Sequence, residues 1–136
     1  MIKKLSTIDV LFGVISLVER NTGLRCYDDL PPKGIDVPFY VVDIVQQEPN
    51  PNKLEFREKY TLAIHSFAEG GSSVPVLEMV QELEEAMTER IELPQGYYLR
   101  DQVSTGLQPI MSDETGCKHA VNVYDFIICY GYKVKV

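Results

Sequence analysis

The sequence predicts an α+β fold in which a mainly antiparallel sheet carries two helices on one face, with long loops between some strands. Apolar residues recur at helical spacing in two segments and alternate at strand spacing in several others. The strand-like segments are grouped around one intervening helix, which favours an antiparallel sheet over alternating βαβ units. At 136 residues with 45% hydrophobic content, the chain is expected to form a single domain over residues 1–136.

The first helix is predicted over residues 7–20. Its small or polar residues recur at spacings of four, three and four, and so form one narrow stripe: Asp9, Gly13, Ser16 and Arg20. The rest of the helix is apolar: Ile8, Val10, Leu11, Phe12, Val14, Ile15, Leu17 and Val18. One sheet can cover only one side of such a helix, so we expect another subunit to cover part of it, with loops of the same chain as the alternative.

Gly23 is a natural left-handed terminator of this helix, and a short strand follows at residues 24–27. Residues 28–34 are rich in turn formers. The next strand, residues 39–45, is apolar at nearly every position, as expected for a strand covered on both faces. Two prolines and two asparagines then predict a mobile loop at residues 46–53, because proline cannot donate to a β-ladder.

The segment from residue 56 to 67 alternates as a strand with one buried and one polar face. The polar face contains Arg57, Lys59, Thr61 and His65, so His65 is interpreted as a residue of this polar face rather than as a catalytic base. A second helix is predicted over residues 74–90, after a serine cap and with Pro75 in its first turn. The double glycine before this helix lacks the lysine and the spacing of a phosphate-binding loop, and we interpret it as a turn.

The last third of the sequence predicts strands around a polar segment. A strand begins at residues 97–100, and residues 101–118 are interpreted as a mobile, glycine-containing stretch with a hairpin tip near residues 112–116. The final strand alternates from residue 124 to residue 136, which is long for so small a domain. Its end is expected to project beyond the compact body or to pair with a neighbour.

Charge and residue types argue against several functions. The chain has 20 acidic and 13 basic residues, and its net charge of −7 disfavours sequence-specific nucleic-acid binding and anionic membranes. Cys117 and His119 supply two metal ligands where a structural zinc site needs four. Asp113 and Glu114 are neighbouring carboxylates, but a loop tip lacks the burial that separates two pKa values. We therefore expect no enzymatic activity, no cofactor and no metal.

The order and spacing of several segments resemble a family of phage proteins. The segments are the apolar first helix leading into Thr22-Gly23-Leu24-Arg25-Cys26-Tyr27, the Pro38-Phe39 strand entrance, the strand running into the glycine-serine turn, and Asp113-Glu114-Thr115-Gly116-Cys117-Lys118-His119-Ala120 before the last strand. Over nearly its whole length the chain is similar to tail completion, tail terminator and tail-to-head joining proteins of long-tailed bacteriophages and prophages. Ala120 departs from the family pattern, which more often has glycine there.

This resemblance implies a structural virion protein at the head-proximal end of the tail. It would form a ring, often a hexamer, that completes the tail and joins it to the head, with itself, the tail tube protein and a head-side neck protein as partners. It would be found in the virion tail or neck, and in the host cytoplasm during assembly. We expect the interface to include Leu11, Phe12, Ile15, Val18, Glu48, Asn50, Asn52, Lys53, Asp113 and Glu114. The alternatives are a head-completion adaptor or stopper, and a small ligand-binding or regulatory α+β module.

Overall fold

The computed structural model describes residues 1–32 and 34–133. The predicted α+β class is confirmed, with two helices and six strands in this part of the chain. In chain order the elements are α1 (Thr7–Thr22), β1 (Cys26–Tyr27), β2 (Phe39–Pro49), β3 (Glu55–Ala68), α2 (Val74–Ala86), β4 (Tyr98–Leu107), β5 (Met111–Ser112) and β6 (Lys118–Tyr132).

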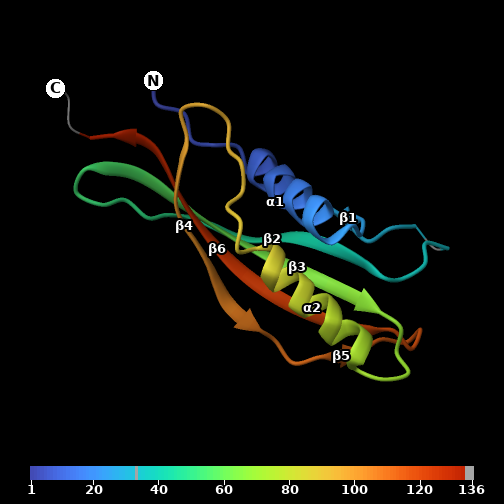
Figure 1. The fold of residues 1–136 in the computed structure, drawn as a ribbon. Helices are drawn as coiled ribbons and strands as arrows, with labels where there is room; N and C mark the ends of the chain where they lie inside the picture. The colour runs from blue at the N-terminus through green and yellow to red at the C-terminus, as the bar shows by residue number, and fades with distance from the viewer. Residues whose placement is uncertain (33, 134–136) are drawn as a thin grey trace.

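The strands form one open sheet in the order β1-β2-β3-β6-β4, and β5 extends it by pairing with the start of β6. All pairs are antiparallel except β1 with β2. The long strands β2, β3 and β6 give the molecule its elongated shape, with the β2–β3 hairpin at one end and the β5–β6 hairpin at the other (Figure 1). The sheet therefore separates two hairpin tips along its length.

Helix α1 has a capping residue at each end, close to the predicted positions. The Ser6 hydroxyl accepts a hydrogen bond from the Ile8 N–H at 3.2 Å, which satisfies one of the unpaired donors of the first turn. Gly23 adopts a left-handed conformation with φ of 75° and donates its N–H to the Glu19 carbonyl. Only glycine takes this conformation without steric cost, which explains why the helix ends there.

Both helices pack on the same face of the sheet and share one core with it. Helix α1 buries Val10, Val14, Leu17 and Val18, and α2 buries Val76, Met79, Val80, Leu83 and Ala86. Two buried tyrosines connect the layers through hydrogen bonds. The Tyr40 hydroxyl donates to the Met79 carbonyl at 2.8 Å, and the Tyr60 hydroxyl donates to the Leu5 carbonyl at 2.6 Å. Residues 1–6 are thereby held against the sheet ahead of α1.

Several predicted boundaries are wrong, because segments taken for loops pair with neighbouring strands. Strand β2 continues through residues 46–49, where Gln47 pairs with Tyr60 and Glu48 with Lys59. Strand β4 continues to Leu107 and β5 adds residues 111–112, so only residues 108–110 and the tip at residues 113–117 lie outside strands. Helix α2 ends at Ala86 instead of residue 90. Strand β2 was predicted to be buried on both faces, but only its first four residues are buried, and the residues after Val42 are mostly exposed.

The end of the last strand also differs from the prediction within the described residues. Tyr132 pairs with Glu55 of β3, and the Lys133 N–H donates to the Leu54 carbonyl at 2.8 Å. Residues 134–136, which the prediction included in the strand, lie outside the described part of the chain. Neither described helix is both long and apolar enough to cross a membrane.

Candidate functional site

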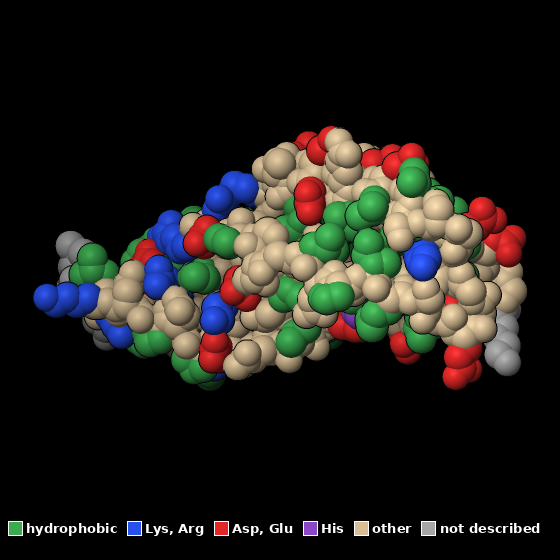
Figure 2. Space-filling view, turned by 90° about the horizontal axis from the view of Figure 1, so that it is seen from below, with side chains coloured by type: hydrophobic (Ala, Val, Ile, Leu, Met, Phe, Trp, Pro, Cys, Tyr) green, Lys and Arg blue, Asp and Glu red, His purple; other side chains and the backbone are tan. Residues whose placement is uncertain are grey.

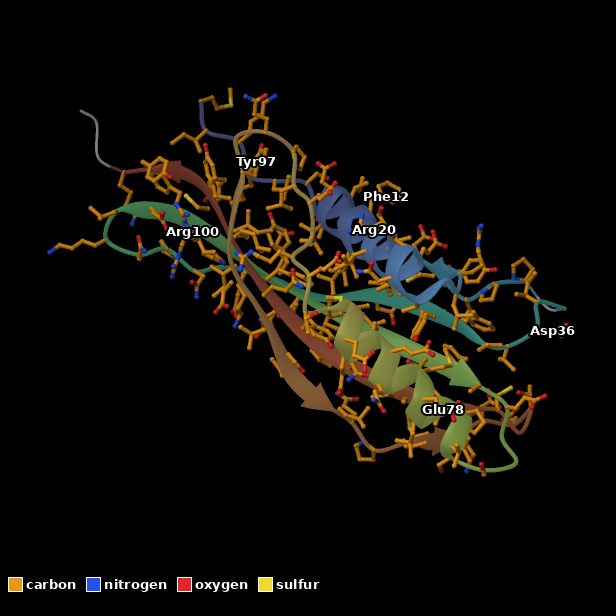
Figure 3. All side chains as sticks on the ribbon, in the orientation of Figure 1. Phe12, Arg20, Asp36, Glu78, Tyr97 and Arg100 are labelled. Atoms are coloured by element: carbon orange, nitrogen blue, oxygen red, sulfur yellow. The ribbon has the colours of Figure 1, made fainter. Side chains whose placement is uncertain are left out.

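The residues expected at an interface lie in three separate places: on α1, in the β2–β3 hairpin (Glu48 of β2 and the tip, residues 50–54) and at the β5–β6 tip (residues 113–117). The tips sit at opposite ends of the sheet, and α1 lies across the helix layer between them (Figures 1 and 3). The structure thus gives one subunit three surfaces rather than one assembled site. Such an arrangement is typical of a protein that contacts several neighbours.

Helix α1 presents two large apolar side chains to solvent. Phe12 is 57% exposed and Ile8, one helical turn earlier, is 59% exposed. Leu11 and Ile15 are half-buried against the core, while Val18 is fully buried within it. Of the four α1 residues expected at the interface, Phe12 is therefore the one that is mainly accessible, and Ile8 is an exposed apolar neighbour that the expected set omitted.

A groove runs beside Phe12, between α1 and the segment that follows α2. Its volume is about 410 Å³, and it is lined by Asp9, Phe12, Gly13, Ser16, Leu17, Arg20, Glu92, Leu93 and Pro94. Gly13 permits this close approach, because a Cβ there would lie 3.1 Å from the Glu92 carbonyl oxygen. The polar stripe predicted from the sequence thus faces the 92–94 segment along a partly apolar groove.

The β2–β3 tip is held in a fixed conformation by its own asparagines. The Asn52 side chain accepts hydrogen bonds from the N–H groups of Leu54 and Glu55, at 3.0 and 2.7 Å. The guanidinium of Arg57 donates to the carbonyl of Asn50 at 3.0 Å and to its side-chain oxygen at 2.8 Å. These contacts show that Asn50 and Asn52 shape the turn. Lys53 and Leu54 are exposed at its apex.

Glu48, the remaining interface candidate in β2, pairs with Lys59 on the adjacent strand at 2.7 Å. This carboxylate raises the pKa of the Lys59 ammonium. The pair spans a cross-strand position, where opposite charges stabilise the sheet modestly. Glu48 therefore has a structural role within the subunit in addition to any contact outside it.

The β5–β6 tip is organised around Asp113. Its carboxylate accepts hydrogen bonds from the Thr115 hydroxyl, the Thr115 N–H and the Cys117 N–H, at 2.6, 2.9 and 3.0 Å. These donors stabilise the charged form and hold the pKa of Asp113 below its usual value, with the Thr115 hydroxyl contributing most. Glu114 is exposed beside it. The two neighbouring carboxylates thus have different roles, turn formation and surface charge.

The sequence did not reveal a histidine pair on the sheet face opposite the helices. His65 Nδ1 lies 2.7 Å from His119 Nε2, and His65 Nε2 lies 2.7 Å from Asp43 Oδ2. Phe67 stacks on the His119 ring with 4.4 Å between centroids. The two histidines are 54 positions apart, so only the pairing register of β3 with β6 brings them together. Sequence periodicity placed His65 on this face but could not identify its partner.

The histidine pair borders a hollow of about 290 Å³ lined by Asp29, Leu30, Val41, Asp43, His65, Phe67 and His119. Its lining supplies no hydroxyl, thiol or amine that the imidazoles could activate as a nucleophile. Among the described residues, no three His, Cys, Asp or Glu side chains are placed to hold a metal ion.

We expect the stability of the protein to fall as pH is lowered from about 7 to about 5.5, partly because of His119. Burial, followed by the neighbouring His65, lowers the pKa of His119 below its ordinary value of about 6.5. The folded state then binds fewer protons than the unfolded state as pH drops through this range, so acid favours unfolding. In urea unfolding at several pH values, the free energy of unfolding should decrease less with falling pH for His119→Gln than for the unchanged chain. Equal pH slopes for the two proteins would contradict this assignment.

Comparison with known proteins gives a family for the whole chain. Residues 1–136 match the model of a phage tail terminator family, described as "Putative tail termination protein". The fold is similar to that of a solved chain from the "Virion of native gene transfer agent (GTA) particle", with a TM-score of 0.71, 11% sequence identity, and coverage of 90% of this chain and 96% of that one. At this identity the likeness concerns the fold. No curated protein sequence matches the chain. The chain therefore belongs to the phage tail terminator family and is a structural protein of phage tail completion.

Proposed function

We propose that copies of this chain form a ring at the head-proximal end of the tail tube, complete the tail there and join it to the head. The partners are further copies of the chain, the tail tube protein and a head-side neck protein. The protein acts as a single domain and has no enzymatic role, cofactor or metal. It recognises neither specific nucleic-acid sequences nor membranes. It enters the virion tail after assembly in the host cytoplasm.

The observation that carries the proposal is the exposed apolar surface of α1. Ile8 and Phe12 lie side by side on a helix whose opposite side already fills the core. Exposed aromatic side chains next to a groove are favoured at protein interfaces, where they bury large area with little loss of side-chain freedom. The family membership and the virion context of the gene transfer agent chain support placing that interface in the tail.

An add-back experiment tests the function. Tails made without this protein are expected to remain unable to join heads, and the purified chain should restore joining when it is incubated with the tails first. Joined particles are counted by electron microscopy and by infectivity. Restoration only after incubation with filled heads would assign the chain to head completion instead. Normal joining without the protein would contradict a role in the neck.

A further inference from the structure

Charge is distributed unevenly along the molecule. Lys and Arg side chains gather towards the end that holds the β2–β3 hairpin, while most Asp and Glu side chains lie towards the other end (Figure 2). Arg100 lies near the first end, and Glu78 and Asp36 lie near the second (Figure 3). The subunit therefore presents a basic end and an acidic end, although its net charge is −7.

The β2–β3 tip carries Lys53, one of several basic side chains at this end that form no ion pair within the described residues. Lys4, Lys59 and Arg100 form ion pairs with glutamates of the same chain. In the described residues, by contrast, no acidic side chain lies within ion-pairing distance of Lys53. Leu54 follows it with 58% of its surface exposed. The tip thus presents a free cation and an apolar side chain together, on a turn that Asn50 and Asn52 already hold in shape.

Helix α2 carries a surface with the opposite charge. A wide groove of about 650 Å³ on its outer side is lined by Leu77, Val80, Gln81, Glu84, Glu85 and Thr88. Leu77 is 44% exposed and Val80 is buried beneath it, which gives an apolar floor. Glu84 and Glu85 are exposed, and neither forms an ion pair with a described Lys or Arg. The groove therefore combines an apolar floor with an acidic rim.

We propose that the β2–β3 tip of one copy lies in the α2 groove of the next copy around the ring, with Leu54 on the floor formed by Leu77 and Val80 and Lys53 beside Glu84 and Glu85. The inference rests on the proposed ring. A ring of more than two copies needs two different patches that complement each other, because each subunit contacts its neighbours head to tail. The tip and the groove complement each other in both charge and apolar character. The preformed turn lowers the cost of ordering the tip on binding.

Cross-linking within assembled tails tests the contact directly. Lys53→Cys and Glu85→Cys are combined in one chain, with Cys117→Ser to remove the one cysteine that is not buried. A disulfide forms only when the two Cα atoms come within about 7 Å of each other. We expect oxidation of purified tails to give a ladder of covalent multimers of the chain. The matched control pairs Lys53→Cys with Asp36→Cys at the acidic end but away from α2, and should give no ladder.

The outcomes separate this contact from the proposed function. Tails that contain the double-cysteine chain and join heads, but give no ladder, would overturn the tip-to-groove contact and leave the ring proposal standing. A cross-link from the cysteine introduced at position 53 to the tail tube protein would also overturn it, by assigning the tip to another partner. If tails complete with none of the chain present, the proposed function itself fails. If tails do not take up the double-cysteine chain, the charge-reversal variants test the same contact in solution.

Charge reversal supplies that second measurement in solution. Lys53→Glu is expected to weaken self-association of the purified chain by about tenfold, because it places like charges together at the groove rim. Adding Glu85→Lys to the same chain should restore association to within about threefold, since the pair is then reversed. Asp36→Lys changes the net charge as much as Glu85→Lys and should not rescue Lys53→Glu. Equal association of Lys53→Glu and the unchanged chain, measured by sedimentation, would contradict the contact.

Discussion

Phe12→Asp is expected to weaken ring assembly by at least about 30-fold, because it removes an exposed aromatic side chain and places a charge where the neighbouring copy would pack. The loss should appear in the add-back assay as tails that stay unjoined at protein concentrations sufficient for the unchanged chain. Phe12 is 57% exposed, so the free energy of unfolding should change little. The effect is therefore on assembly rather than on folding.

Ile35→Asp is the matched control, since Ile35 is an apolar residue of similar exposure, 46%, in the loop between β1 and β2. It should assemble normally. Ile15→Asp is a poorer test than Phe12→Asp, because Ile15 is half-buried against the core and its replacement would also destabilise the fold. Normal head joining by the Phe12→Asp chain would remove α1 from the interface.

Phe126→Ala is expected to lower the free energy of unfolding by about 3–5 kcal/mol, the usual cost of deleting a buried phenylalanine side chain. Phe126 is fully buried in β6, opposite Tyr60 of β3 and Gln102 of β4. Its ring belongs to the core that both helices share with the sheet. Urea unfolding followed by circular dichroism measures the change.

Phe12→Ala is the matched control for this measurement, since it removes the same side chain from an exposed position and should cost less than about 0.5 kcal/mol. A loss below about 1 kcal/mol for Phe126→Ala would contradict the central position of β6 in the core. Comparison of the two variants therefore distinguishes a phenylalanine that stabilises the subunit from one that is available for contacts between subunits.

The elements with strong periodicity were predictable from the sequence. The stripe of small and polar residues indicated the orientation of α1, and Gly23 indicated its end within about two residues. The alternation of Tyr124, Phe126 and Ile128 identified the core face of β6. These signals are local, because each depends on residues a few positions apart and on one buried face.

Features that depend on strand register were not predictable. The prolines near residue 50 indicated a loop, yet residues 46–49 belong to β2 and pair with β3 before the turn. Glu58 lies between Phe56 and Tyr60 and is only 2% exposed, but its partners come from distant segments: its carboxylate accepts from Gln47 at 2.8 Å and lies 3.2 Å from the Lys4 ammonium. The contact between His65 and His119 likewise needed the alignment of distant strands, which a single sequence does not contain.

The sequence predicted that α1 has more apolar surface than its own subunit covers, but it overestimated how much of that surface is exposed. Core packing covers Val18 fully and Leu11 and Ile15 in part, because the sheet and α2 both contact this helix. What remains is a smaller surface centred on Ile8 and Phe12. The expected interface residues on α1, at Glu48 of β2 and at the two tips stay predictions.

An electron cryomicroscopy reconstruction of the head-proximal end of purified tails would reveal the proposed ring itself. We expect a closed ring made of copies of this chain, stacked on the last layer of the tail tube, with Ile8 and Phe12 of each copy against a neighbouring subunit. A tail end that carries no copies of the chain, or one isolated copy with Phe12 facing solvent, would contradict it.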